Sequence, residues 1–182
     1  PPRYFSESEE MPFGDFTIAA IINWKGKRKE KLKISEIMDT RFSSKYKPDQ
    51  KFVIFEYWTK KLIGFYTLNE QFVSPPIEKH GVLYVSIIPV KSEQIEEPVF
   101  LTSTLHIKQG LAEIKSWVKD KNKITIDLEL AGEHSGSLYF LMPLKMDMKS
   151  DSIPVKNYDI INGKLAEVPL TLKEKGKIVL TF

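Results

Sequence analysis

The sequence predicts an all-β chain in which two antiparallel β-sandwich-like modules follow an extended N-terminal strap. Short runs rich in Ile, Val, Phe, Tyr and Leu alternate with clusters of Gly, Pro, Asn and Asp, a pattern typical of strands separated by turns. No segment keeps the 3.6-residue periodicity of a long helix. Strands at regular spacing with turn signals between them favour sandwiches.

The strap and the first module occupy residues 1–15 and 16–90. Prolines, Gly14 and a group of glutamates break up residues 1–15 and predict an extended segment. The basic run from Lys25 to Lys31 is interpreted as a solvated turn at the tip of a hairpin. In 16–90 we predict a helical turn from Ile34 to Met38 and strands over 16–23, 29–34, 51–58, 62–68, 71–73 and 81–88.

The second module is expected over residues 98–182, after a charged joint from Pro89 to Pro98. Residues 123–130 alternate strictly, which predicts a strand with one apolar face and one wet face. Residues 132–136 contain two glycines and are interpreted as a turn. The predicted strands of this module are 100–107, 111–118, 123–130, 137–144, 152–156, 164–170 and 176–182.

Composition limits the classes of function. The 182 residues hold no Cys, and all but three of the 27 basic residues are Lys. Lys and Glu enrichment is a hyperthermophile signature, and a cysteine-free chain fits the cytoplasm. The net charge of +3 is small and no apolar stretch is long enough to span a bilayer, so we expect neither a nucleic-acid nor a membrane partner. The chain begins at Pro1, and we expect it to be a piece of a longer protein.

Motifs that carry chemistry are missing from the sequence. The three histidines, His80, His106 and His134, have no companion ligands at metal-site spacing. Nucleophile-elbow, P-loop and dinucleotide-binding patterns are absent. The carboxylates fall in predicted turns or on polar strand faces, where a solvated surface charge is expected. The sequence therefore predicts no catalytic residue, no metal ligand and no cofactor.

Five aromatic residues are the candidate contact residues: Trp24, Tyr57, Trp58, Tyr66 and Trp117. Exposed on one face, they would form a platform for stacking sugars or for contacting a neighbouring domain. For Trp24 and Trp58 we favour packing in the core, because Trp58 follows a continuous apolar run. Burying such a ring contributes roughly 2–3 kcal/mol.

Four segments carry a resemblance to a known family: residues 18–24 (IAAIINW), 55–64 (FEYWTKKLIG), 79–81 (KHG) and 101–110 (LTSTLHIKQG). Together they resemble the C-terminal β-sandwich region of glycoside hydrolase family 36, the α-galactosidases and raffinose-synthase-like proteins, in an archaeal form. The resemblance covers most of residues 16–130.

The resemblance implies a non-catalytic region that stabilises a catalytic (β/α)8 barrel and mediates contacts between enzyme copies. The family's two catalytic aspartates lie on that barrel, one of them in a Lys-x-Asp motif. Lys47-Pro48-Asp49 and Lys145-Met146-Asp147 match those letters, but both lie among β-type runs and receive no catalytic role. Two alternatives stay open, a carbohydrate-binding β-sandwich and an immunoglobulin-like structural or interaction domain.

Overall fold

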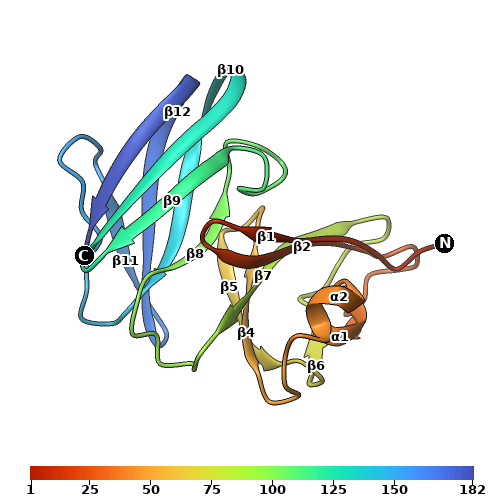
Figure 1. Cartoon of the computed structure of the whole chain (residues 1–182). Helices are drawn as coiled ribbons and strands as arrows, with labels where there is room; N and C mark the ends of the chain where they lie inside the picture. Colours follow the sequence, from red (N-terminus) through yellow and green to blue (C-terminus); the bar gives the residue numbers. More distant parts are fainter. The chain divides into compact units, whose positions relative to one another are not determined.

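A computed structural model describes all 182 residues and confirms the all-β prediction with antiparallel sheets (Figure 1). The chain divides into two compact units. The first comprises residues 1–10 and 15–91, and the second comprises residues 11–14 and 92–182. The two helices span four residues each, so neither could cross a bilayer.

The first unit is built on a five-stranded sheet with the order β1-β2-β7-β4-β5, and a small β3–β6 sheet accompanies it. The predicted helical turn is confirmed as α1. The elements are β1 (Tyr4–Met11), β2 (Gly14–Ile22), β3 (Lys31–Lys33), α1 (Ile34–Ile37), α2 (Thr40–Ser43), β4 (Lys51–Glu56), β5 (Lys61–Thr67), β6 (Gln71–Val73) and β7 (Val82–Val90).

One hydrophobic cluster of the first unit lies on one face of this sheet, and Val53 and Phe55 of the other face are buried as well. Side chains two apart along a strand share a face, and Phe52 with Ile54 on β4 points to the same side as Val85 with Ile87 on β7. The small sheet and the two helices cover this side with Leu32, Ile34, Ile37, Phe42 and Phe72. The sheet therefore has a layer packed over it, and the groove described below lies in the same unit.

The basic run does not sit on a hairpin, and that prediction is wrong. β2 pairs with β7, whereas β3 pairs with β6. The connecting residues include Arg28, which forms an isolated bridge with Ile77, and Glu30, which is buried. The reason is that β3 is a three-residue strand whose only buried side chain, Leu32, joins the layer over the sheet.

The second unit is a five-stranded sheet with the order β11-β12-β10-β8, in which β9 also pairs with β10. Ile124, Ile126 and Leu128 are buried while the residues between them are more exposed, so the predicted alternation in 123–130 is confirmed. The elements are β8 (Val99–Ser103), β9 (Ile114–Asp120), β10 (Lys123–Met142), β11 (Lys156–Ile160) and β12 (Gly163–Thr181).

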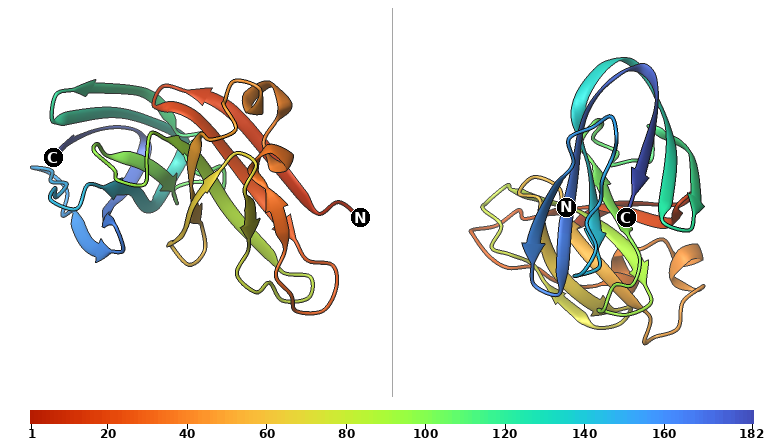
Figure 2. Two further views of the ribbon diagram at one scale, coloured as in Figure 1. Left: turned by 90° about the horizontal axis from the view of Figure 1, so that it is seen from below. Right: turned by 90° about the vertical axis from the view of Figure 1, so that its left-hand side faces the viewer.

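Two long strands replace four predicted short ones. β10 runs through residues 132–136, so the predicted turn there is wrong, and β12 joins the predicted strands 164–170 and 176–182. The pairing of β10 with β12 shifts register between Glu129 and Glu133, and Gly132 in this stretch has a φ of 86°. The glycine accommodates a bulge within a continuous strand rather than a chain reversal. Figure 2 shows the two strands curving together along their length.

Candidate functional site

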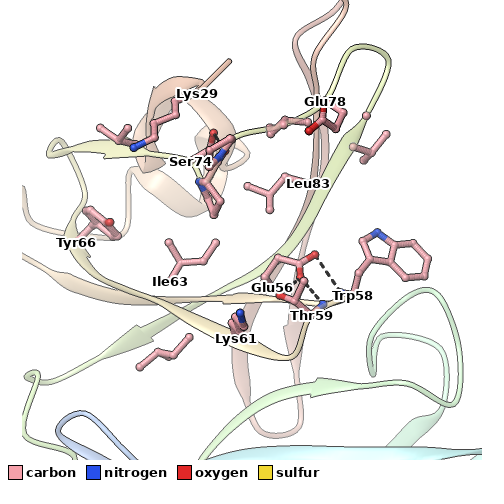
Figure 3. A pocket seen from close by; sticks show the side chains of 17 residues that line it. Lys29, Glu56, Trp58, Thr59, Lys61, Ile63, Tyr66, Ser74, Glu78 and Leu83 are labelled. Atoms are coloured by element: carbon pink, nitrogen blue, oxygen red, sulfur yellow. Dashed lines mark hydrogen bonds between the residues drawn. The ribbon is translucent and has the colours of Figure 1, made fainter. Parts of the chain in front are cut away.

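A groove of about 670 Å³ in the first unit is the candidate site (Figure 3). One side is formed by the end of β4, the turn after it and β5. The other side is formed by residues 73–78, and the start of β7 contributes Val82 and Leu83. Most of the lining is apolar, and its charged side chains are Lys29, Glu56, Lys61 and Glu78.

Trp58 is held at one side of the groove by a turn built on Glu56. The Glu56 side chain is buried, and its carboxylate accepts hydrogen bonds from the Trp58 amide at 3.0 Å and from the amide and hydroxyl of Thr59. Figure 3 shows these bonds. Lys60 completes the turn with a φ of 56°. The indole is 58% exposed and meets the buried Tyr57 ring edge-on, with the centroids 4.8 Å apart.

The opposite side is held by Asn23, which is fully buried and directly follows β2. Its amide nitrogen donates to the carbonyls of Ile77 at 2.7 Å, Glu78 at 3.1 Å and Gly26 at 3.1 Å. The amide oxygen accepts from the Lys25 N–H at 3.0 Å. One side chain therefore fixes both the 24–26 loop and the groove segment.

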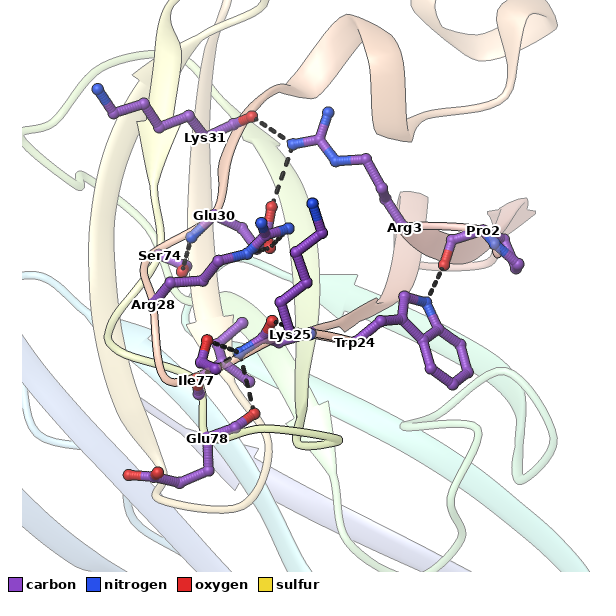
Figure 4. Close-up of polar contacts among 12 residues, drawn as sticks. Pro2, Arg3, Trp24, Lys25, Arg28, Glu30, Lys31, Ser74, Ile77 and Glu78 are labelled. Carbon is purple, nitrogen blue, oxygen red and sulfur yellow. Dashed lines mark hydrogen bonds and ion pairs between the residues drawn. The ribbon is translucent and has the colours of Figure 1, made fainter.

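An ion-pair cluster around the buried Glu30 supports the same segment (Figure 4). The Glu30 carboxylate lies 3.2 Å from the Arg3 guanidinium and 2.5 Å from that of Arg28. The Glu30 backbone N–H donates to the Ser74 hydroxyl, and its carbonyl accepts from the Ser74 N–H. Because these groups satisfy one another, the groove segment is anchored at Ser74 as well as at Ile77.

The charged side chains that line the groove differ in whether they have a partner. The Glu56 carboxylate accepts hydrogen bonds within its own turn, and Glu78 pairs with Lys27 at 2.6 Å. Lys29 and Lys61 also line the groove, and neither has an ion-pair partner. The groove therefore combines apolar surface with two lysines that form no ion pair.

Of the five predicted contact residues, Trp58 and Tyr66 line the groove, and Tyr57 lies buried beneath Trp58. Trp24 does not line it, and its indole N–H donates to the Pro2 carbonyl at 2.6 Å. Trp117 belongs to the second unit, where it contacts Phe13, Phe100 and Phe140. The structure thus brings three of the five together.

The prediction that Trp24 and Trp58 pack in the core is wrong, because they are 41% and 58% exposed. Each lies two residues beyond the end of a strand, β2 and β4 respectively. The apolar run that precedes Trp58 ends at Phe55, and the turn held by Glu56 carries the indole outward.

Sequence reasoning missed the exposed Val73 and Val82, and it missed Lys29 and Lys61. The valines lie on two different strands, β6 and β7, and no shared sequence motif connects them. The Pro75-Pro76 pair was the one local signal, since it predicts an extended segment that leaves a sheet.

The second unit holds an unusual buried acid, Glu113. The side chain is inaccessible to solvent, and neither carboxylate oxygen makes a hydrogen bond of regular geometry. Burial raises the pKa of Glu113 above its ordinary value of 4.5, although the nearby Ser103 and His106 oppose that shift. Of the aspartates in the two Lys-x-Asp matches, Asp147 pairs with Lys164 at 2.6 Å. No three His, Asp or Glu side chains gather in an arrangement that could hold a metal ion.

No protein-family model matches the chain, and no curated protein is significantly similar to it.

Proposed function

We propose that the chain is the non-catalytic C-terminal region of an α-galactosidase-like glycoside hydrolase, and that its groove packs against the catalytic (β/α)8 barrel of that enzyme. Residues 55–64, one of the segments that carry the resemblance, form the Glu56 turn and the start of β5. The Lys-rich, cysteine-free composition supports a cytoplasmic enzyme from a thermophilic archaeon.

The observation that carries this proposal is the clustering of exposed apolar side chains at one groove. Trp58, Val73 and Val82 are 58%, 39% and 45% exposed, and all three line it. Single exposed apolar residues are common, but a contiguous patch beside a groove is typical of an interaction surface. A covering partner would remove these side chains from water, at about 25 cal/mol for each Å² buried.

The role of such a region is mechanical. The turn at Glu56, the Asn23 contacts and the Glu30 cluster hold the groove on rigid elements. A rigid support under a catalytic domain keeps its reacting groups in position. The same surface could serve contacts between enzyme copies, as the resemblance implies.

Covalent labelling tests whether the groove is covered. The chain has no cysteine, so Trp58→Cys introduces one reactive thiol that peptide mass spectrometry can follow. We expect maleimide to modify it rapidly in the 182-residue chain and at least about tenfold more slowly in the full-length gene product. Ile161→Cys, at a position 85% exposed in the second unit, is the control for general accessibility.

Activity tests the identity of the enzyme. The full-length gene product is expected to hydrolyse an aryl α-galactoside, and the 182-residue chain is expected to be inactive. Hydrolysis by the chain alone, or inactivity of the full-length product, would overturn the proposal.

The exposed indole of Trp58 favours a second candidate, a carbohydrate-binding module. An aromatic face beside a groove with polar groups is the usual platform for a sugar ring. Affinity electrophoresis through gels containing galactomannan or starch separates the two functions. Retardation that Trp58→Ala abolishes would favour the binding module, whereas unchanged mobility agrees with the packing role.

A further inference from the structure

The edge strand β5 is open on one side. It is the last strand in the order β1-β2-β7-β4-β5 and pairs only with β4. Residues 61–66 make no backbone hydrogen bond outside that ladder. Such a row of unpaired N–H and C=O groups is a template for another strand.

The two edges of this sheet differ in how they are protected. β1 carries Glu7, Glu9 and Glu10 within eight residues, and clustered charge on an edge strand discourages pairing. β5 has the sequence KLIGFYT, with Lys61 as its one charged residue. All residues after Lys61 are partly buried rather than fully exposed. The ladder of β5 with β4 also contains a bulge, between the pairs Ile54–Gly64 and Phe55–Leu62, but with one charged residue β5 is the less protected of the two edges.

The groove lies beside this edge. Lys61, Leu62, Ile63 and Tyr66 of β5 line it together with Trp58. In an added strand, successive side chains point to opposite faces. Every second side chain of that strand would enter the groove, where the exposed surfaces of Trp58, Val73 and Val82 favour apolar groups.

The charge of the site selects among such segments. Lys29 and Lys61 have no ion-pair partner, whereas the carboxylates of Glu56 and Glu78 are already satisfied. An incoming carboxylate would complement the two lysines, and an incoming Lys or Arg would add a like charge.

From these observations we infer that β5 is a docking edge for an extended, acidic polypeptide segment, which adds a strand to the sheet and places its alternate apolar side chains in the groove. The inference rests on the proposed function for the identity of the partner, since it names the kind of barrel segment that the groove receives. The recognition itself depends on no catalytic activity. A polysaccharide lacks the regular row of amides that an open strand edge pairs with.

A synthetic peptide tests the inference directly on the 182-residue chain. The probe is a fluorescein-labelled peptide that alternates glutamate with valine, and binding is followed by fluorescence polarisation. We expect saturable binding with a Kd of about 100 μM or tighter. A peptide that alternates lysine with valine is expected to bind at least about tenfold more weakly. No binding of the glutamate peptide overturns the inference.

Backbone methylation separates strand addition from side-chain binding. Two versions of the probe carry N-methyl groups on its odd or its even residues. Only every second amide of an added strand faces its neighbour, so one version should lose binding and the other should keep it. Equal binding by both versions overturns strand addition.

Protein variants locate the site. Lys61→Glu and Lys29→Glu should each weaken binding by about tenfold, and Trp58→Ala should weaken it while Trp58→Phe retains part. Lys123→Glu, which changes an exposed lysine of the second unit, should leave binding unchanged. Amide NMR shifts on peptide addition should concentrate in residues 61–66. Shifts there with a galacto-oligosaccharide but not with the peptide would overturn the inference.

The two proposals fail separately. If the full-length product lacks α-galactosidase activity but the peptide binds β5, the enzyme assignment falls and the docking edge stands. If activity is present and the peptide does not bind, the docking edge falls alone.

Discussion

Glu56 illustrates how one buried carboxylate determines the exposure of its neighbours. It accepts from two backbone amides and one hydroxyl in the turn after β4. Carboxylates that accept backbone N–H bonds are found where a chain must turn without a regular ladder. The position of Trp58 at the groove therefore depends on a residue that is itself buried.

Glu56→Ala should destabilise the chain by about 1–3 kcal/mol, because it leaves the amides of Trp58 and Thr59 without their acceptor. Chemical denaturation followed by tryptophan fluorescence measures the change. Glu78→Ala is the matched control, since its exposed pair with Lys27 contributes little. Equal effects of the two substitutions would contradict the account of the turn.

Glu113 makes the second unit sensitive to pH. Its pKa is raised in the folded state, so the folded chain binds its proton more tightly than the unfolded chain does. The associated stability is fully present below the unfolded pKa of 4.5 and is lost as pH rises from there through the folded pKa.

Glu113→Gln should remove this dependence, because an amide resembles the neutral acid in shape and cannot ionise. Relative to the natural chain, the variant should be more stable at about pH 8 and gain nothing at about pH 4. Urea midpoints at both pH values provide the measurement. Glu129→Gln, at an exposed carboxylate paired with Lys175, should show no such gain, and a gain there would argue against a local effect of burial.

At the scale of elements, β10 depends on a glycine that lets two backbones approach. A Cβ at Gly136 would lie 2.8 Å from the backbone nitrogen of Leu105 and 2.8 Å from the carbonyl carbon of Thr104. Thr104 and Ser137 also exchange hydrogen bonds at this point. The close approach extends the pairing of β10 with the chain that leaves β8.

Gly136→Ala should therefore cost about 1–3 kcal/mol, since backbone atoms must shift to admit the methyl group. Gly26→Ala is the comparison, because a Cβ there meets nothing within 4 Å and should change stability by less than about 0.5 kcal/mol. Thermal unfolding of both variants decides the matter. A neutral Gly136→Ala would show that the two backbones are less tightly apposed.

At the scale of the whole molecule, the second unit is assembled from two separate stretches of chain. Residues 11–14 belong to it although the residues on both sides belong to the first unit. The Phe13 ring in this short stretch lies 4.7 Å from Phe100 and 5.4 Å from Trp117, measured between centroids. An N-terminal turn thus contributes to an aromatic cluster formed by residues far along the sequence.

Phe13→Ala should destabilise the second unit by about 1–3 kcal/mol through lost ring packing. Trp117 reports on this unit once Trp24 and Trp58 have been replaced by Phe. In that background the Trp117 unfolding transition should move to lower temperature. Phe5→Ala, at a ring 59% exposed, should leave the transition in place, and a similar shift from both substitutions would contradict the specific role of Phe13.

The sequence predicted those features that depend on local pattern. Alternation in residues 123–130 and the apolar run 52–55 both correspond to strands. The glycines of 132–136 led to the wrong prediction of a turn, because glycine is favoured both in β-bulges and in turns. Only the partner strand β12 distinguishes them.

The groove was predictable in part. Trp58 and Tyr66 are predicted contact residues that line the groove, but its other side comes from β6 and β7, and the pairing of distant strands is not encoded locally. The outward position of Trp58 depends on the bonds made by Glu56, and an acid after an apolar run carries no signature of that role. Solvent exposure in the structure distinguishes the groove residues from the core residues, whereas residue type does not.

The divided second unit also bears on how such a chain can be rearranged during evolution. A gene fusion that carried residues 92–182 into another protein would leave Phe13 and its four-residue turn behind. The transplanted half would then lack a ring that packs against Phe100 and Trp117. We therefore expect recombination to keep the two units together in one gene.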